Sequence, residues 1–421
     1  MAERSASNSA FGIRIAAFYG ALFVVYGMYV PYMPVWLDWR GLSAGEISAV
    51  LAVPLFLRLL ITPFVALAAD RAGAHRALVI GLAWLSLGIC LALSQAPSFW
   101  PIALLAAPFV ICNSTIMPLT ETIAVAGVRS AGLDYGRMRL WGSLTFVAAS
   151  FAGGLAIAQY GGGVGIWLVA IGCVLTIIAA HALPRPAPTP LARSAALPLW
   201  RAPEPAALLR QPAFRAFLLA AGGAQAAHAT FLGFGALIWQ TQGLSGAWIG
   251  ALWAIGVFVE VAVFSVSDWL IRRYGPAQLL LAAAIVSAFR WAAMALQPDL
   301  GWLIALQALH GVTYGASHIA AIHFVHIAVP RRAAGIGQAL YATVAAGLLM
   351  GVATLIAGRL YAPDGALAYA AMVAVSGLAI AGALRLRKAW SGGLLLPEID
   401  GAASARDDEP EVLAPEPRIG G

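Results

Sequence analysis

The sequence predicts an all-α membrane protein with twelve transmembrane helices in two pseudo-symmetric six-helix bundles. Hydrophobic residues make up 61% of its 421 residues and charged residues only 10%, and the mean hydropathy is +0.85. Apolar runs long enough to cross about 30 Å of hydrocarbon as helices recur along the chain. Most of these runs have no polar face, which excludes a soluble helical protein.

The predicted spans begin after Arg4 and Arg14. The first apolar run is too long for a signal-peptide core and no small-residue cleavage site follows it, so we expect this helix to remain as the insertion signal. Basic residues punctuate the loops that separate the later runs. The twelve predicted spans are 15–36, 46–69, 77–95, 100–127, 138–159, 164–183, 214–240, 247–270, 277–296, 300–328, 334–358 and 366–385.

Composition divides the chain into four parts. Residues 1–183 and 214–388 hold six predicted spans each, and the Pro-rich basic segment 184–213 links them. Residues 389–421 are polar and acidic, and we expect a disordered tail because they cannot bury enough apolar surface to order themselves. With a cytoplasmic N-terminus, inside segments hold 21 of the 25 Lys and Arg residues. The positive-inside rule therefore predicts cytoplasmic N- and C-termini in the cell inner membrane.

The two halves repeat each other. Gly-Leu-Ser at 41–43 recurs at 243–245, an offset of 202 residues (243 − 41). At the same offset Arg58 aligns with Glu260, and Tyr26 with His228. Two duplicated halves joined by a long cytoplasmic segment are typical of secondary transporters. A chance match of a few residues is the alternative, and the agreement with topology disfavours it.

Five ionisable residues lie within or near the ends of apolar spans: Arg58, Glu121, Arg139, Glu260 and Arg290. A charge at bilayer depth costs roughly 2.5–3.5 kcal/mol or more, so such residues usually have a partner or a function. We expect Glu260 to be the partner of Arg290, whereas Arg58 has no obvious acid. Structural ion pairs, or ties to backbone carbonyls, are the alternatives to functional roles.

Several motifs resemble those of a known family. The loop Ala-Asp-Arg-Ala-Gly-Ala-His-Arg at 69–76 is similar to the loop between helices two and three of the major facilitator superfamily. Residues 134–143, Asp-Tyr-Gly-Arg-Met-Arg-Leu-Trp-Gly-Ser, resemble the start of helix five in the phenylpropionate permease family. This family is related to lactose permease, and the resemblance implies proton-coupled symport.

The resemblance to lactose permease implies roles for individual residues. Glu121 and Arg139 match its substrate-binding pair, and Phe146 stands where it has a sugar-stacking tryptophan. Three further residues match its proton-coupling residues: Glu260, Arg290 and His310. Thr313 occupies the position of its proton-carrying glutamate, so the lactose mechanism does not transfer unchanged.

The remaining candidates follow from position. Arg58, Tyr26 and His228 are expected to bind substrate, with packing as the alternative for the two rings. The helix 2–3 loop is expected to form a cytoplasmic gate, with topological charge as the alternative; its charged residues are Asp70, Arg71 and Arg76.

We therefore expect a proton symporter that imports a small carboxylic acid, aromatic or otherwise, and that functions as a monomer in the lipid bilayer. Efflux of drugs or metabolites and symport of a neutral sugar- or nucleoside-like solute are the alternatives. A sensor role also stays open. No nucleotide-binding loop, metal-ligand spacing or nucleophile elbow occurs, so we expect no cofactor, no metal, no nucleic-acid partner and no enzyme activity.

Overall fold

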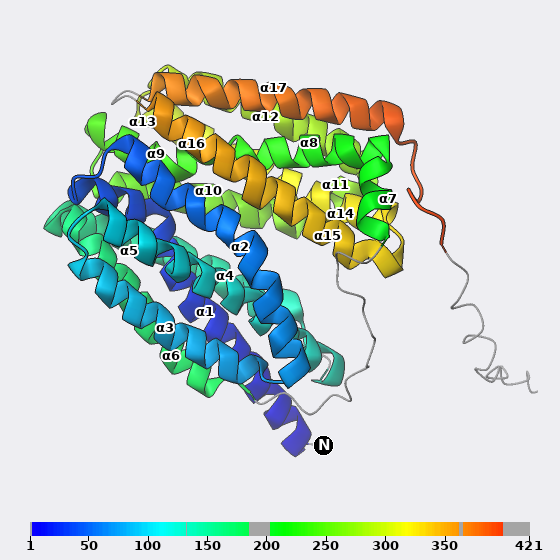
Figure 1. The fold of residues 1–421 in the computed structure, drawn as a ribbon, viewed down its shortest axis with the longest axis horizontal. Coiled ribbons are helices and arrows are strands. Elements are labelled where there is room, and N and C mark those ends of the chain that lie inside the picture. The colour runs from blue at the N-terminus through cyan, green and yellow to red at the C-terminus, as the bar shows by residue number, and fades with distance from the viewer. Residues whose placement is uncertain (1, 132, 185–202, 362–364, 399–421) are drawn as a thin grey trace, which may run out of the picture.

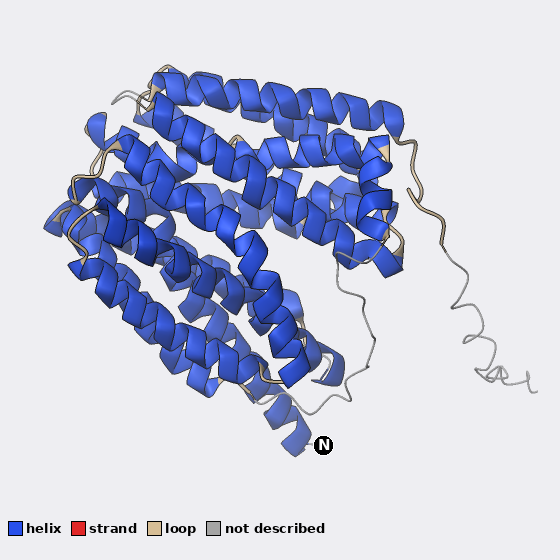
Figure 2. Ribbon diagram, in the orientation of Figure 1, coloured by secondary structure: helices blue, strands red, loops and turns tan. Residues whose placement is uncertain are grey.

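The computed structural model describes residues 2–131, 133–184, 203–361 and 365–398. All regular structure in these ranges is helical, without any strand (Figure 2), which confirms the all-α fold class. In the first half the helices are α1 (Ala2–Trp39), α2 (Ala44–Ala72), α3 (His75–Gln95), α4 (Phe99–Ala131), α5 (Tyr135–Tyr160), the short 3₁₀ turn η1 (Gly162–Val164) and α6 (Gly165–Ala182).

The second half contains more interruptions. Its elements are α7 (Glu204–Arg210), α8 (Pro212–Ala226), α9 (Ala229–Thr241), α10 (Gly246–Ser265), α11 (Ser267–Tyr274), α12 (Pro276–Ala295), α13 (Leu300–Ala308), η2 (Gly311–Ala316), α14 (Ser317–Ala328), η3 (Arg331–Ala333), α15 (Ala334–Ala342), η4 (Thr343–Leu349), α16 (Met350–Leu360) and α17 (Ala366–Ala389). Segments η2 and η4 are π-helical and η3 is a 3₁₀ turn.

Eleven helical segments in the described ranges are long and apolar enough to cross a membrane. The predicted span 300–328 is not among them; in this region the π segment η2 lies between α13 and α14. The span predicted at 214–240 also has a break, at Ala227 and His228, between α8 and α9. The count of twelve therefore stays a prediction.

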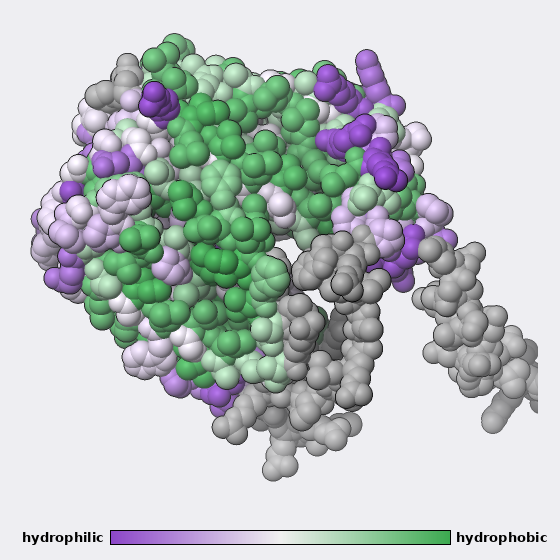
Figure 3. Space-filling model, in the orientation of Figure 1, coloured by the Kyte–Doolittle hydropathy of each residue, from purple (hydrophilic) through white to green (hydrophobic). Residues whose placement is uncertain are grey.

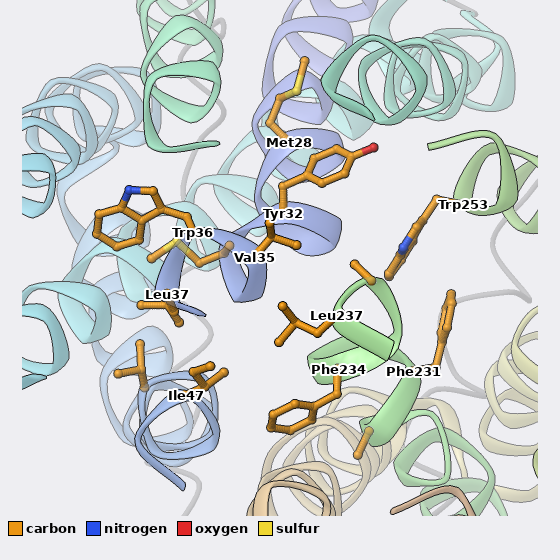
Figure 4. Packing of buried hydrophobic residues seen from close by; sticks show 14 of the residues in the cluster. Met28, Tyr32, Val35, Trp36, Leu37, Ile47, Phe231, Phe234, Leu237 and Trp253 are labelled. Atoms are coloured by element: carbon orange, nitrogen blue, oxygen red, sulfur yellow. The ribbon is translucent and has the colours of Figure 1, made fainter. Parts of the chain in front are cut away.

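The two groups of helices meet at one end and diverge at the other (Figure 1). Contacts between them join α5 to α10, α2 to α16 and α1 to α9. A single core cluster runs through both groups and includes Tyr32 and Trp36 of α1 with Phe234 and Leu237 of α9 (Figure 4). The ends that hold the N-terminus and α7 are the ones that diverge.

Close contact between α5 and α10 depends on glycine. A Cβ at Gly154 or Gly246 would collide with the other helix's backbone, and one at Gly250 would lie 2.6 Å from the Ser150 carbonyl oxygen. The Tyr32 hydroxyl donates a hydrogen bond to that same Ser150 carbonyl. Small residues let helix backbones approach this closely in membrane proteins.

The outer surface suits a lipid environment. Large hydrophobic side chains are exposed around the described helices, and hydrophobic residues cover much of the face in Figure 3. A monomeric soluble protein rarely exposes such extensive apolar area. The chain is therefore a multi-pass membrane protein.

Two segments outside the predicted bundles carry structure. Helix α7 lies in the region predicted as a linker and buries Leu208 completely. After α17, Trp390 packs edge-on against Phe324 at 4.9 Å, and the Leu395 amide donates to the Ala328 carbonyl at 2.7 Å. The predicted disordered tail therefore does not include residues 389–398, and the prediction remains for residues 399–421, which lie outside the described residues. Most of the predicted linker also lies outside them.

The glycine contact generates the first prediction. Gly154→Leu should separate α5 from α10 because no space exists for the added side chain, and overpacking of this kind costs about 1–3 kcal/mol. We expect the distance between spin labels at Tyr160→Cys and Trp248→Cys to increase. Gly88→Leu on α3 is the matched control, because nothing lies within 4 Å of a Cβ there. An unchanged label distance in Gly154→Leu would contradict the proposed packing constraint.

Candidate functional site

A buried arginine forms the centre of the site. Arg290 of α12 has no exposed surface. Its Nη2 donates to Gln307 Oε1 at 2.7 Å, and its Nη1 faces Thr313 Oγ1 at 3.1 Å and His310 Nδ1 at 3.2 Å. The guanidinium also lies 4.5 Å from the ring centre of Trp291. Arginine keeps its charge in proteins, so these uncharged residues stabilise a permanent positive charge.

His310 connects Arg290 to Glu260. An arginine N–H can only donate, so His310 Nδ1 accepts, and a neutral His310 carries its proton on Nε2. That nitrogen lies 3.5 Å from Glu260 Oε2. The direct Arg290–Glu260 pair expected from the sequence is thus replaced by a contact through His310.

His228 forms a second branch of the cluster. It sits at the break between α8 and α9, where its Nδ1 lies 3.0 Å from the Ala224 carbonyl oxygen and its Nε2 lies 3.1 Å from Thr313 Oγ1. A carbonyl only accepts, so Nδ1 carries the proton and Nε2 of the neutral ring accepts from the Thr313 hydroxyl. Arg290 therefore donates to Thr313, Thr313 donates to His228, and His228 donates to the Ala224 carbonyl oxygen.

Glycines bring Glu260 close to His310. Gly311 and Gly315 of η2 face α10, where a Cβ on Gly311 would lie 2.9 Å from the Val259 carbonyl oxygen and one on Gly315 would lie 3.2 Å from Glu260 Cγ. Larger residues would hold the helices apart and lengthen the Glu260–His310 contact.

The candidate substrate residues of the first group lie on α1, α2, α4 and α5. Arg58 donates from Nη2 to the Ala346 carbonyl in η4 at 2.8 Å, which realises the tie to a backbone carbonyl that the sequence left open. Tyr26 donates to the Asn113 carbonyl at 2.9 Å. Because Arg58 lies on α2 and Ala346 on η4, the Arg58 bond joins the first group of helices to the second.

Glu121 and Arg139 contact neighbouring aromatic residues. Glu121 Oε1 accepts from the Tyr135 hydroxyl at 3.2 Å, and the Arg139 guanidinium lies 4.1 Å from the ring centre of Phe23. No Glu121–Arg139 ion pair occurs among the described residues. Phe146 is half-buried against the shared core cluster.

Charges of the two groups face each other across their boundary. Arg139 of α5 interacts electrostatically with Glu260 of α10 and with His318 of α14. Glu260 is half-buried, with 16% of its side chain exposed. The carboxylate thus contacts His310 within its own bundle and lies within the electrostatic range of Arg139 in the other, without a direct contact between them among the described residues.

Tyr314 is a site residue that the sequence analysis missed. Its ring stacks on His310 at 5.2 Å and on His318 at 6.5 Å, with interplanar angles of 10° and 15°. The spacing of four residues between these three rings is the signal that could have identified it.

The predicted gate is only partly described. Asp70 and Arg71 belong to the last turn of α2, and their side chains lie outside the described residues. Arg76 donates from Nε to the Leu183 carbonyl at 2.8 Å and from Nη2 to the His181 carbonyl at 2.6 Å. Arg76 therefore ties the start of α3 to the end of α6, and the gating role stays a prediction.

Comparisons with known proteins identify the chain. The MFS_1-like family matches residues 12–371. The chain belongs to this family. It is 32% identical over 353 residues to a probable 3-phenylpropionic acid transporter of Escherichia coli K12, covering 82% of this chain and 90% of the relative. It is 29% identical to a maltose permease of Geobacillus stearothermophilus, covering 82% of this chain and 86% of the relative.

Solved structures support the same fold. The nucleoside transporter NupG superposes with a TM-score of 0.74 at 15% identity, covering 90% of this chain and 99% of that one. A bacterial homologue of the human lysosomal transporter Spinster superposes with a TM-score of 0.68 at 14% identity, covering 91% and 96%. This protein is therefore a transporter of the major facilitator superfamily and not an enzyme.

In this transporter Thr313 provides the second prediction. Thr313→Val keeps the shape but removes the hydroxyl between Arg290 and His228, leaving buried polar groups unsatisfied at about 1–3 kcal/mol. We expect a lower thermal unfolding temperature in detergent. Thr354→Val is the control, since the described bond of that buried hydroxyl goes to its own helix at the Met350 carbonyl. Equal losses in the two variants would argue against a special role for Thr313.

Proposed function

We propose that this transporter is a proton-coupled symporter that imports a small carboxylic acid, and specifically an aromatic one. The observation that carries the proposal is the position of Glu260. It contacts His310, which bonds to the buried Arg290, and it faces Arg139 of the other bundle. Burial favours the protonated form of this carboxyl group and the nearby cations favour its ionised form, so Glu260 is suited to take up and release a proton at the bundle boundary.

The same position supplies a reason for coupling. Protonation removes the negative charge of Glu260, which leaves Arg139 and Arg290 with less compensation. A substrate carboxylate that enters the boundary restores the balance, and Arg58 and Arg139 are its candidate ligands. Because charge-assisted hydrogen bonds strengthen in low dielectric, proton and anion then bind best together.

Two relatives bear on the substrate. The name of the Escherichia coli relative supports a phenyl-substituted acid. Tyr26, Phe146 and Tyr314 are the aromatic residues that we propose receive its ring. The maltose permease relative supports the second candidate, a neutral sugar-like solute held by Glu121, Arg139 and His228. Proton-coupled efflux uses the same residues and differs only in direction.

The proposal includes a conformation and an orientation. With both termini cytoplasmic in the inner membrane of a bacterial cell, the divergent end in Figure 1 opens inward. The glycine contact of α5 with α10 then closes the outer side. We propose that Asp70, Arg71 and Arg76 act at the inner side as a gate, and that one chain functions as a monomer.

Glu260→Gln tests the proton site. The amide cannot release a proton at physiological pH, so uphill accumulation of 3-phenylpropionate in proteoliposomes should stop. Exchange of labelled for unlabelled substrate should continue, because exchange needs no net proton movement. Normal accumulation in this variant would refute the role of Glu260.

Glu46→Gln is the matched control. Glu46 Oε2 accepts from the Ser43 amide at 2.8 Å at the start of α2, far along the chain from the charged cluster. The amide can still accept that bond, so accumulation should remain near the wild-type level.

Arg58→Gln tests the carboxylate site. A hydrogen bond to a charged group contributes roughly 1.5–3 kcal/mol, or about a 10- to 150-fold change in affinity. We expect binding of 3-phenylpropionate to weaken by about that factor, and binding of 3-phenylpropanamide to change little. Calorimetry on the purified protein measures both. Equal affinity of the wild-type protein for acid and amide would favour the neutral-solute candidate.

A further inference from the structure

A basic pocket lies at the shared end of two helices, away from the charged site. Helices α8 and α17 pack along each other, and their ends enclose a pocket of about 430 Å³. Its lining residues are Pro212, Arg215, Ala216 and Leu219 of α8 with Arg385, Lys388 and Ala389 of α17. Three of them are cations and none is acidic.

The cations of this pocket have little compensation within the protein. Arg215 Nη1 donates to the Leu209 carbonyl at 3.5 Å, which is a long bond. Arg385 and Lys388 make no hydrogen bond or ion pair with any other residue that the structure describes. Arg332, by contrast, pairs with Glu204 at 3.8 Å. Three like charges around one pocket repel each other, and an anion between them relieves that repulsion.

The backbone adds to the preference for an anion. Helix α8 begins at Pro212, so the positive end of its dipole lies at the pocket. Arg385 and Lys388 complement the negative end of α17. Their interaction with the helix dipole is an alternative reason for basic residues near the end of α17. It does not explain why Arg215, which belongs to another helix, lies beside them.

The surroundings select a lipid over a soluble anion. Both helices belong to candidate membrane spans, Pro212–Thr241 and Ala366–Ala389, so the pocket lies at the depth of lipid headgroups. Ala216 and Leu219 form an apolar wall beside the cations. Figure 3 shows hydrophilic residues at this end of α17 directly beside hydrophobic surface. A phosphate at the cations would leave acyl chains against that surface.

We propose that this pocket binds the phosphodiester headgroup of an anionic phospholipid. Arg215 and Arg385 can each present two N–H groups to phosphate oxygens, and Lys388 adds a point charge. Basic pockets between membrane helices on the cytoplasmic side bind anionic headgroups in the same manner. The site is separate from the transport residues, so it goes beyond the proposed function.

Native mass spectrometry of the full chain in detergent tests the proposal. The probes are phosphatidylglycerol and phosphatidylcholine with identical acyl chains. The wild-type protein should bind phosphatidylglycerol more tightly. Each cation contributes about fivefold in affinity, the equivalent of about 1 kcal/mol. The triple variant R215Q/R385Q/K388Q should therefore lose roughly 100-fold in phosphatidylglycerol affinity and little in phosphatidylcholine affinity.

The control variant is R272Q/R273Q, which removes an exposed basic pair from α11 and should leave lipid affinity unchanged. Equal losses in the two variants would overturn the proposal in favour of general surface charge. Equal binding of the two lipids by the wild-type protein would overturn it without any variant. Displacement of phosphatidylglycerol by equimolar inorganic phosphate would assign the pocket to a soluble anion instead.

Discussion

The permanent charge of Arg290 is the constraint on which the rest of the second bundle depends. A fully buried guanidinium in a membrane protein must have its N–H groups satisfied and its charge compensated. Here Gln307, Thr313 and His310 accept from Nη1 and Nη2, whereas Nε has no hydrogen-bond partner among the described residues. Glu260 supplies the compensating negative charge through its contact with His310. Because the compensation is indirect, changing the charge of Glu260 alters the environment of Arg290 without breaking its own bonds.

That arrangement explains the irregular backbone around it. His228, which bonds to Thr313, lies at the break between α8 and α9. Gly311 and Gly315 let α10 come close enough for Glu260 to contact His310. Regular helices with larger residues at these positions would separate the polar groups. Broken helices in membranes are tolerated where neighbouring polar groups satisfy the freed backbone, and this cluster fulfils that condition.

The sequence predicted the class of fold and the ionisable residues because both depend on local composition. Apolar runs identify membrane helices, and a charge within such a run stands out. The partners of each charge depend on tertiary packing and were not predictable in the same way. Arg58, for example, bonds to Ala346, which lies 288 residues later in the chain. Tyr314 was missed because an aromatic residue in an apolar helix is usually a packing residue.

The π segment η2 affects the positions of three aromatic residues around the helix axis. In a regular α-helix, residues four apart are separated by about 400°, so a column of rings spaced by four drifts by about 40° at each step. A π segment has a wider turn and rotates less per residue, which opposes this drift. Tyr314 lies within η2, and His310 and His318 flank it; the three rings stack nearly parallel, at interplanar angles of 10° and 15°. The wider turn thereby helps to keep the imidazoles of His310 and His318 on the same face of the helix.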